Sequence, residues 1–151
     1  MARKFEFSLQ KVLDVRQLIQ DQKISELNKA QSALSAAEAL LSNSEGEKER
    51  IFTEAKMQPL DIRTIKIREA YLKQLDERIL QQHRMVRQCE DNVEIARVAL
   101  QTASKEKKTV EKLREKAHSE YQRKQRSRQE MIDSEIALRR TGFDSEVGGA
   151  E

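Results

Sequence analysis

Two side chains with the spacing of a metal-ligand pair lie in the second half of the chain. Glu115 and His118 form an E-x-x-H pair, the spacing that di-iron helical bundles use. Such a centre needs two of these pairs and further inward-facing glutamates. The only other histidine, His83, has Leu80 three positions before it, so the second pair is missing. We therefore predict no metal site and interpret Glu115 and His118 as a surface pair.

The other reactive side chains provide no catalytic centre. Cys89 is the only cysteine, so it cannot form an intramolecular disulfide, and a nucleophilic thiol would need a base beside it that the sequence does not supply. There is no glycine-rich phosphate loop and no clustered carboxylate pair in a pocket. We predict that the protein is not an enzyme and binds no cofactor. His83, next to Gln82, is interpreted either as a polar contact to a partner or as a solvated side chain.

A basic cluster is the strongest block of one charge, and it consists of Arg123, Lys124, Arg126 and Arg128. It can be a solvated helix face, a contact for an acidic protein surface, or a site for nucleic acid or an anionic bilayer. Lys and Arg number 29 against 26 acidic residues, and the two signs are interleaved, which is a weak footprint for nucleic acid. We predict no nucleic-acid partner.

The termini and the hydropathy pattern bear on location. Residues 1–10 alternate charges and aromatics and lack the apolar stretch of a secretion signal, and no run approaches the ~18 apolar residues of a membrane span. We therefore expect a cytoplasmic protein with no direct membrane insertion.

Apolar residues in 3,4 spacing predict the elements that position these side chains. One stripe consists of Leu72, Leu75, Ile79, Gln82, Val86, Cys89, Val93, Ala96, Leu100 and Ala103. A second stripe consists of Leu27, Ala30, Leu34, Ala37, Leu41, Ile51 and Ala55. The only proline, Pro59, lies between them. Such seams are typical of coiled coils, and Cys89 is expected to be a small buried residue on its seam. Within helix one we expect a local stutter or a change of partner between Gln20 and Ile24, because Ile24 enters the stripe one position early.

The predicted fold class is all-α, a long antiparallel two-helix coiled-coil hairpin over residues 1–140. Helix one is expected over about 8–56, with Ser8 as its cap, the turn over 57–61, and helix two over about 60–140. Residues 141–151 are expected to be a disordered tail. A turn at Pro59 would place Leu9 opposite Thr109 and Val110, so that residues from about Glu111 to Arg140 overhang. A long helix with an apolar stripe and no internal partner usually meets another protein.

Both ends of the chain resemble a known family. The opening Phe5, Phe7, Leu9, Gln10, Lys11, Val12, Leu13, Asp14, Val15, Arg16 is similar to the "F-x-F-x-L-Q-K-V-L-D-x-R" start of the FliJ family of flagellar export proteins. The later segments Glu111, Lys112, Leu113 and Asp133, Glu135, Ile136, Ala137, Arg139, Arg140 are similar to that family's close. The resemblance implies a hairpin similar to the central stalk of rotary ATPases and a non-enzymatic role in the flagellar type III export apparatus. The implied partners are the hexameric export ATPase, the export gate membrane protein and substrate chaperones, with the protein held peripherally at the inner face of the cell membrane.

The resemblance also implies two contact surfaces. The end that carries both termini is expected to enter the ATPase ring, through Leu9, Val12, Leu13, Arg16, Arg128, Ile136, Arg139 and Arg140. The gate-facing surface is expected in the half nearer the turn, through Ile51, Phe52, Tyr71, Leu75, Ile79 and His83. Helix one departs from the family there, because it has no tyrosine between Ser42 and Arg50. The alternative functions are the equivalent stalk of a virulence-type injectisome and a generic coiled-coil scaffold.

Overall fold

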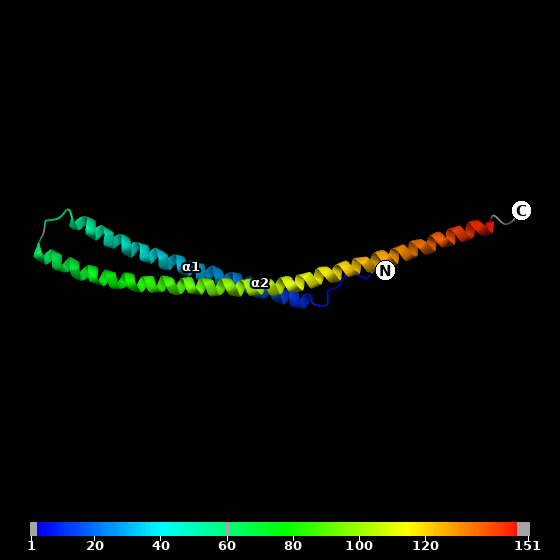
Figure 1. Ribbon diagram of the computed structural model, residues 1–151, viewed down its shortest axis with the longest axis horizontal. Coiled ribbons are helices and arrows are strands. Elements are labelled where there is room, and N and C mark those ends of the chain that lie inside the picture. Colours follow the sequence, from blue (N-terminus) through cyan, green and yellow to red (C-terminus); the bar gives the residue numbers. More distant parts are fainter. Residues whose placement is uncertain (1–2, 60, 148–151) are drawn as a thin grey trace. The chain divides into compact units, whose positions relative to one another are not determined.

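Two long helices account for nearly all of the described chain. The computed structural model describes residues 3–59 and 61–147, and its elements are α1 (Gln10–Ala55, 46 residues) and α2 (Ile62–Val147, 86 residues) (Figure 1). The described residues contain no strand. The predicted all-α class with two long helices is therefore confirmed.

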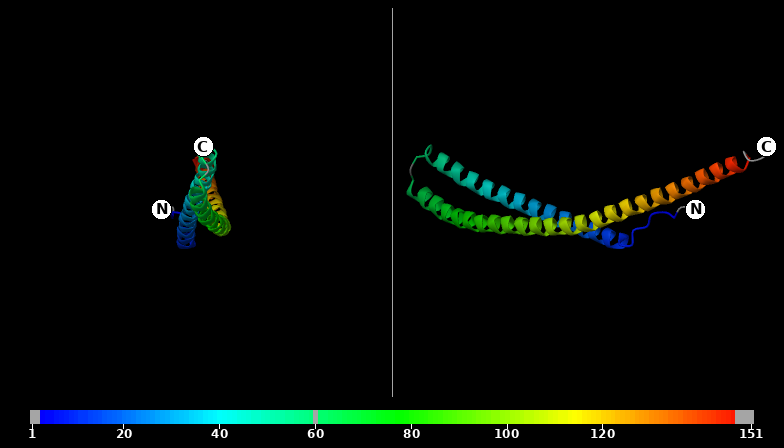
Figure 2. Two further views of the ribbon diagram at one scale, coloured as in Figure 1. Left: turned by 90° about the vertical axis from the view of Figure 1, so that its left-hand side faces the viewer. Right: turned by 45° about the vertical axis from the view of Figure 1, so that its right-hand side comes forward.

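The chain divides into two compact units. The loop unit comprises Leu18–Lys105, and the terminal unit comprises the chain before Leu18 together with the chain after Lys105. In the loop unit, α1 and α2 lie side by side and antiparallel, joined by the connection between Ala55 and Ile62 (Figure 2). Each unit contains segments of both helices, so each has its own interhelical contacts.

Local hydrogen bonds explain where the helices begin. The Gln10 amide donates to the Phe7 carbonyl at 3.1 Å, so α1 begins at Gln10 rather than at Ser8. Asp61 caps α2, because its carboxylate accepts from the Arg63 amide and the Thr64 hydroxyl, each at 3.4 Å. A carboxylate there satisfies free amides and complements the positive end of the helix dipole. Pro59 lies in the connection, and the predicted helix start at residue 60 lies outside the described residues.

The predicted seam of α2 is confirmed in the loop unit. All ten predicted positions from Leu72 to Ala103 are buried or half-buried, and Leu75 is only 1% exposed. Ala37 of α1 forms a buried cluster with Val86 and Cys89 of α2. Leu34 and Leu41 pack against this cluster, so that a large side chain of α1 lies on either side of the small Ala37. Cys89 is therefore a buried seam residue, as its spacing predicts.

The predicted stutter at Ile24 is wrong. Ile24 is 41% exposed, whereas Gln20, Lys23 and Leu27 are half-buried and keep the 3,4 spacing unbroken. Lys23 takes the seam position that hydropathy assigns to Ile24. A lysine can do so because its aliphatic stem lies along apolar surface while its ammonium reaches solvent, here at 3.0 Å from the Glu26 carboxylate.

The register of the hairpin differs from the prediction. The Lys48 ammonium lies 2.5 Å from the Asp76 carboxylate, and the side-chain amide of Gln20 donates to the Ser104 hydroxyl at 3.0 Å. A turn centred on Pro59 would instead have placed Ala70 opposite Lys48 and Val98 opposite Gln20. The cause lies in the connection, because Arg68 donates to the Gln58 side chain at 3.2 Å. Gln58 therefore lies beside the second turn of α2. The first turn of α2 thus extends past the end of α1.

The C-terminal end of α2 also differs from the prediction. The helix continues through Thr141 and Gly142 to Val147, where a tail from Thr141 was expected. The Thr141 hydroxyl donates to the carbonyls of Ala137 and Leu138 at 3.2 and 3.0 Å, which keeps this residue within the helical turn. The last part of the expected tail, residues 148–151, lies outside the described residues.

Candidate partner-binding surfaces

An aromatic clasp holds the segment before α1 against α2 in the terminal unit. The Phe5 ring lies edge-on to the His118 ring with centroids 4.9 Å apart, and 5.5 Å from the Tyr121 ring. The Tyr121 hydroxyl donates to the backbone carbonyl of Arg3. We call Phe5, His118 and Tyr121 the aromatic clasp. It shows that contact between α2 and the segment before α1 reaches Tyr121, so the overhang predicted from Glu111 is wrong over its first part.

The clasp gives His118 a structural role. Both Glu115 and His118 are exposed, and the His118 ring also contacts the Phe5 ring. Among residues 3–59 and 61–147, no group of three or more His, Cys, Asp or Glu side chains could hold a metal ion.

The residues of α1 expected at the ATPase end differ in accessibility. Leu9 and Val12 are exposed, whereas Leu13 is half-buried on the side facing α2. The Arg16 guanidinium lies 2.5 Å from the Glu106 carboxylate of α2. Leu9 and Val12 are thus available to a partner, while Arg16 also helps to hold the two helices of the terminal unit together.

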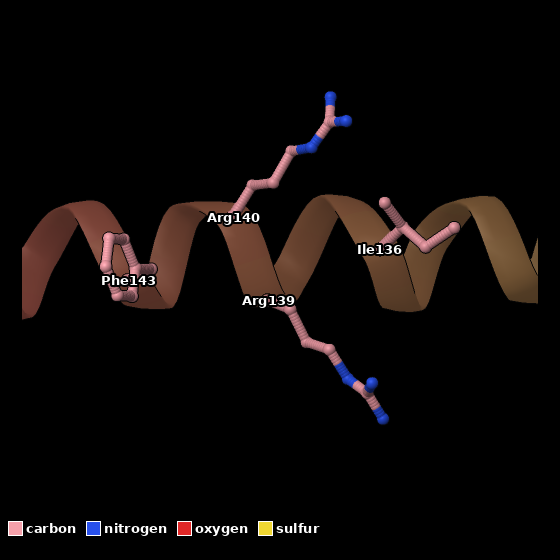
Figure 3. Close-up of a pocket in the computed structure, with 4 residues that line it drawn as sticks. All are labelled: Ile136, Arg139, Arg140 and Phe143. Carbon is pink, nitrogen blue, oxygen red and sulfur yellow. The ribbon is translucent and has the colours of Figure 1, made fainter.

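Beyond the clasp, α2 presents a bare helix. Every side chain from Arg126 to Phe143 is exposed. Ile136, Arg139, Arg140 and Phe143 line one shallow hollow. Figure 3 shows that Arg139 and Arg140 extend to opposite sides of the helix, with Ile136 and Phe143 along the face between them. Because one helix supplies all four, this hollow has no opposite wall among the described residues.

The structure groups the predicted ATPase residues into two sets. Ile136 lies fifteen residues beyond Tyr121 on α2, or about 22 Å at 1.5 Å per residue. The α1 residues, by contrast, lie near Glu106, as the Arg16 ion pair demonstrates. The expected site is therefore an extended surface on the terminal unit rather than a compact patch.

In the loop unit, some predicted gate residues share a groove. Phe52 is 49% exposed and lines an open groove together with Ile79, Glu45 and Lys48. The Lys48 ammonium lies 6.0 Å from the centre of the Phe52 ring, at the outer range of a cation–π contact. This groove joins an aromatic side chain of α1 to an aliphatic one of α2.

Two further gate residues make polar contacts across the hairpin. His83 Nε2 lies 3.2 Å from Glu45 Oε1, and the Tyr71 hydroxyl donates to the Glu47 carboxylate. That hydrogen bond raises the pKa of Tyr71, because it favours the protonated phenol. Leu75 is buried against α1 and cannot reach a partner while the hairpin is closed, whereas Ile51 is half-buried.

Sequence reasoning missed the aromatic clasp. The sequence places Phe5 in a family motif, and the predicted register leaves Tyr121 within the overhang with no residue of helix one opposite it. The aromatic character of Phe5 and Tyr121 was the feature of the sequence that could have indicated this contact. The chain is only 4% aromatic, so an aromatic before helix one and another on the seam spacing of helix two are candidates for one contact.

Comparisons with known proteins identify the family of this chain. None of the helices in the described ranges is long and apolar enough to cross a membrane. The comparisons with curated proteins and with solved structures gave no match. A family model described as "Flagellar FliJ protein" matches residues 5–142, which run from the clasp phenylalanine to the last turns of α2. The match covers most of the 151 residues, and the chain therefore belongs to the FliJ family of flagellar proteins.

Proposed function

We propose that the protein engages the hexameric flagellar export ATPase as a central stalk, through its terminal unit. Membership of the FliJ family makes it a flagellar export-related protein, and the family is a non-enzymatic export component. The finer role rests on the terminal unit. Leu9, Val12, Leu13 and Arg16 form one part of the contact surface, and Arg128, Ile136, Arg139 and Arg140 form the other.

One observation carries this proposal, namely the bare stretch of α2 from Arg126 to Phe143. Its apolar side chains are 46–70% exposed, and they are Met131, Ile132, Ile136, Leu138 and Phe143. Exposed apolar side chains at helical spacing, interleaved with arginines, are typical of a helix that meets another protein.

The chemistry of this stretch suits a changing contact. A single helix inside a six-fold ring cannot make six equivalent tight contacts. Arginines flanking modest apolar side chains provide attraction that depends on the facing charge and that can be exchanged between neighbouring subunits. A large apolar hot spot would favour one fixed position instead.

The loop unit is the proposed contact for the export gate. Phe52, Tyr71 and His83 are accessible there, and Ile79 lines the groove beside Phe52. Leu75 supports this surface from within the seam. On this proposal the protein sits at the inner face of the cell membrane at the flagellar base, where it also meets substrate chaperones.

The test of the ATPase contact is the double substitution Arg139→Glu and Arg140→Glu. Both side chains are exposed and make no ion pair among the described residues, so the free energy of unfolding should change by no more than about 0.5 kcal/mol. Co-sedimentation with the purified export ATPase should weaken, and export-dependent motility should fall.

The matched control is Arg84→Glu with Arg87→Glu, which makes the same change in charge on exposed positions of the loop unit. The control should bind the ATPase as the parent does. If the Arg139/Arg140 variant also bound the ATPase as well as the parent at equal salt, the proposal that the terminal unit enters the ring would have to be abandoned.

A further inference from the structure

The geometry points to a second binding surface in the terminal unit, a basic groove that takes an acidic segment of a partner protein. The groove is lined by Arg3, Lys4, Phe5, Tyr121, Lys124 and Arg128. It centres on the clasp and reaches the first turn of the bare stretch of α2, where Arg128 belongs to both surfaces. Its argument does not require the ATPase contact proposed above.

The groove is assembled by the clasp from the two ends of the chain. The hydrogen bond from the Tyr121 hydroxyl to the Arg3 carbonyl fixes the backbone of the N-terminal segment on α2. The Phe5 ring contacts Tyr121 and His118 and so fixes the same segment two residues further along the chain. Arg3 and Lys4 are thereby brought to the same groove as Lys124 of α2.

The groove carries four cations against two carboxylates, Glu6 and Glu120, so its formal net charge is positive. Among the ion pairs of the described residues, none involves Arg3, Lys4, Lys124 or Arg128. Four positive side chains at one groove repel one another, so an incoming anion relieves that repulsion and gains charge-assisted hydrogen bonds. The lining therefore selects a negatively charged ligand.

Two carboxylates at the same groove favour a peptide over a nucleic acid. Glu6 and Glu120 also line it, and they repel a continuous chain of phosphates. An acidic peptide carries both side-chain carboxylates and backbone N–H groups. Its carboxylates can pair with the Arg and Lys side chains, and its N–H groups can donate to Glu6 and Glu120. The half-buried rings of Phe5 and Tyr121 provide the apolar surface that an aliphatic side chain of the peptide would cover.

The experiment measures fluorescence anisotropy of a short fluorescein-labelled peptide rich in Asp and Glu with one central Leu, titrated with the full chain. The parent should bind this peptide, and the affinity should fall as salt rises because exposed charges are screened. Replacing Lys4 and Lys124 with Glu should weaken binding about tenfold or more, since attraction becomes repulsion at two of the four cations.

Two further variants separate charge from architecture. Phe5→Ala should also weaken peptide binding, because it releases Arg3 and Lys4 from α2 without changing the charge. The matched control, Lys66→Glu with Lys73→Glu, makes the same change in charge on exposed positions of the loop unit and should bind the peptide as the parent does. Circular dichroism on each variant verifies that the helices are retained.

Three results would overturn this inference: no binding of the acidic peptide by the parent, equal binding by the parent and the Lys4/Lys124 variant, or tighter binding of a single-stranded oligonucleotide of equal charge. None of them bears on the Arg139/Arg140 test, because Arg139 and Arg140 do not line the groove. Failure of either proposal can therefore be recognised separately.

Discussion

The loop unit and the terminal unit hold the same two helices together with different side chains. In the loop unit the contact is an aliphatic seam in which Ala37, Val86 and Cys89 are buried together. In the terminal unit the Arg16–Glu106 ion pair joins the two helices, and the clasp around Phe5 holds the segment before α1 against α2. Aliphatic burial stabilises in proportion to the area removed from water, whereas an exposed ion pair contributes little. The seam therefore supplies most of the stability, and rearranging the terminal contacts costs less free energy than rearranging the seam.

The largest expected effect comes from placing a charge in the seam of the loop unit. Val93 is buried, so Val93→Asp should lower the free energy of unfolding by several kcal/mol, about 3 or more, because the carboxylate has no partner there. Val110→Asp makes the same change at a half-buried position of the terminal unit and should cost about 1 kcal/mol. Urea unfolding followed by circular dichroism measures both, and equal costs would remove the distinction between the units.

A smaller effect is expected from breaking the clasp. Phe5→Ala removes two ring contacts, each worth about 1 kcal/mol in typical aromatic pairs. Hydrogen exchange should become faster in the segment before α1, while the amides of the loop unit keep their protection. Phe143→Ala is the control, because Phe143 is exposed and makes no ring contact among the described residues. Faster exchange throughout the loop unit would contradict a local role for the clasp.

The loop unit can also be strengthened on its own. Gly46 lies within α1, and a Cβ built on it meets nothing within 4 Å. Gly46→Ala should therefore raise the free energy of unfolding by about 0.5–1 kcal/mol, because alanine loses less conformational entropy in a helix. Thermal unfolding measures this change. A lower melting temperature would mean that the helix at this position tolerates no side chain, contrary to the open space around it.

The smallest effect concerns the pH dependence of a polar contact in the loop unit. The hydrogen bond to Glu47 raises the pKa of Tyr71 above its ordinary value near 10. Its contribution to stability is therefore complete below about pH 10 and is lost as pH rises through the pKa of the folded state. The difference in stability between the parent and Tyr71→Phe should shrink over this range. A difference independent of pH up to 11.5 or so would show that the phenol is not held by the carboxylate.

The seam could be predicted from the sequence because it depends on spacing alone. The ten α2 positions from Leu72 to Ala103 follow one period, and helical geometry puts them on one face whatever lies opposite. Lys23 shows that spacing also outweighs hydropathy, since a lysine keeps the seam position while Ile24 faces solvent.

Register and tertiary contacts could not be predicted in this way. The pairing of Lys48 with Asp76 depends on the path of the connection, which the position of Pro59 does not determine. The clasp depends in turn on that register, because Phe5 meets Tyr121 only when α2 is displaced relative to α1. The continuation of α2 past Gly142 could not be predicted in this way, because a segment rich in glycine and acidic residues indicates a disordered tail. A helix interior nevertheless tolerates one glycine at a cost of about 1 kcal/mol.

The connection around residue 58 keeps the two helices together only by holding them near each other. Lys56 and Met57 are exposed there, so the recognition site of a specific protease could be inserted between them and cut. The products would be two separate chains, one carrying all 46 residues of α1 and the other all 86 residues of α2. A short covalent link supplies an effective concentration in the millimolar range. Cutting it turns a fold that is independent of dilution into an association between complementary fragments. The strength of that association comes from the seam and the terminal contacts together, and it is measured directly as a dissociation constant.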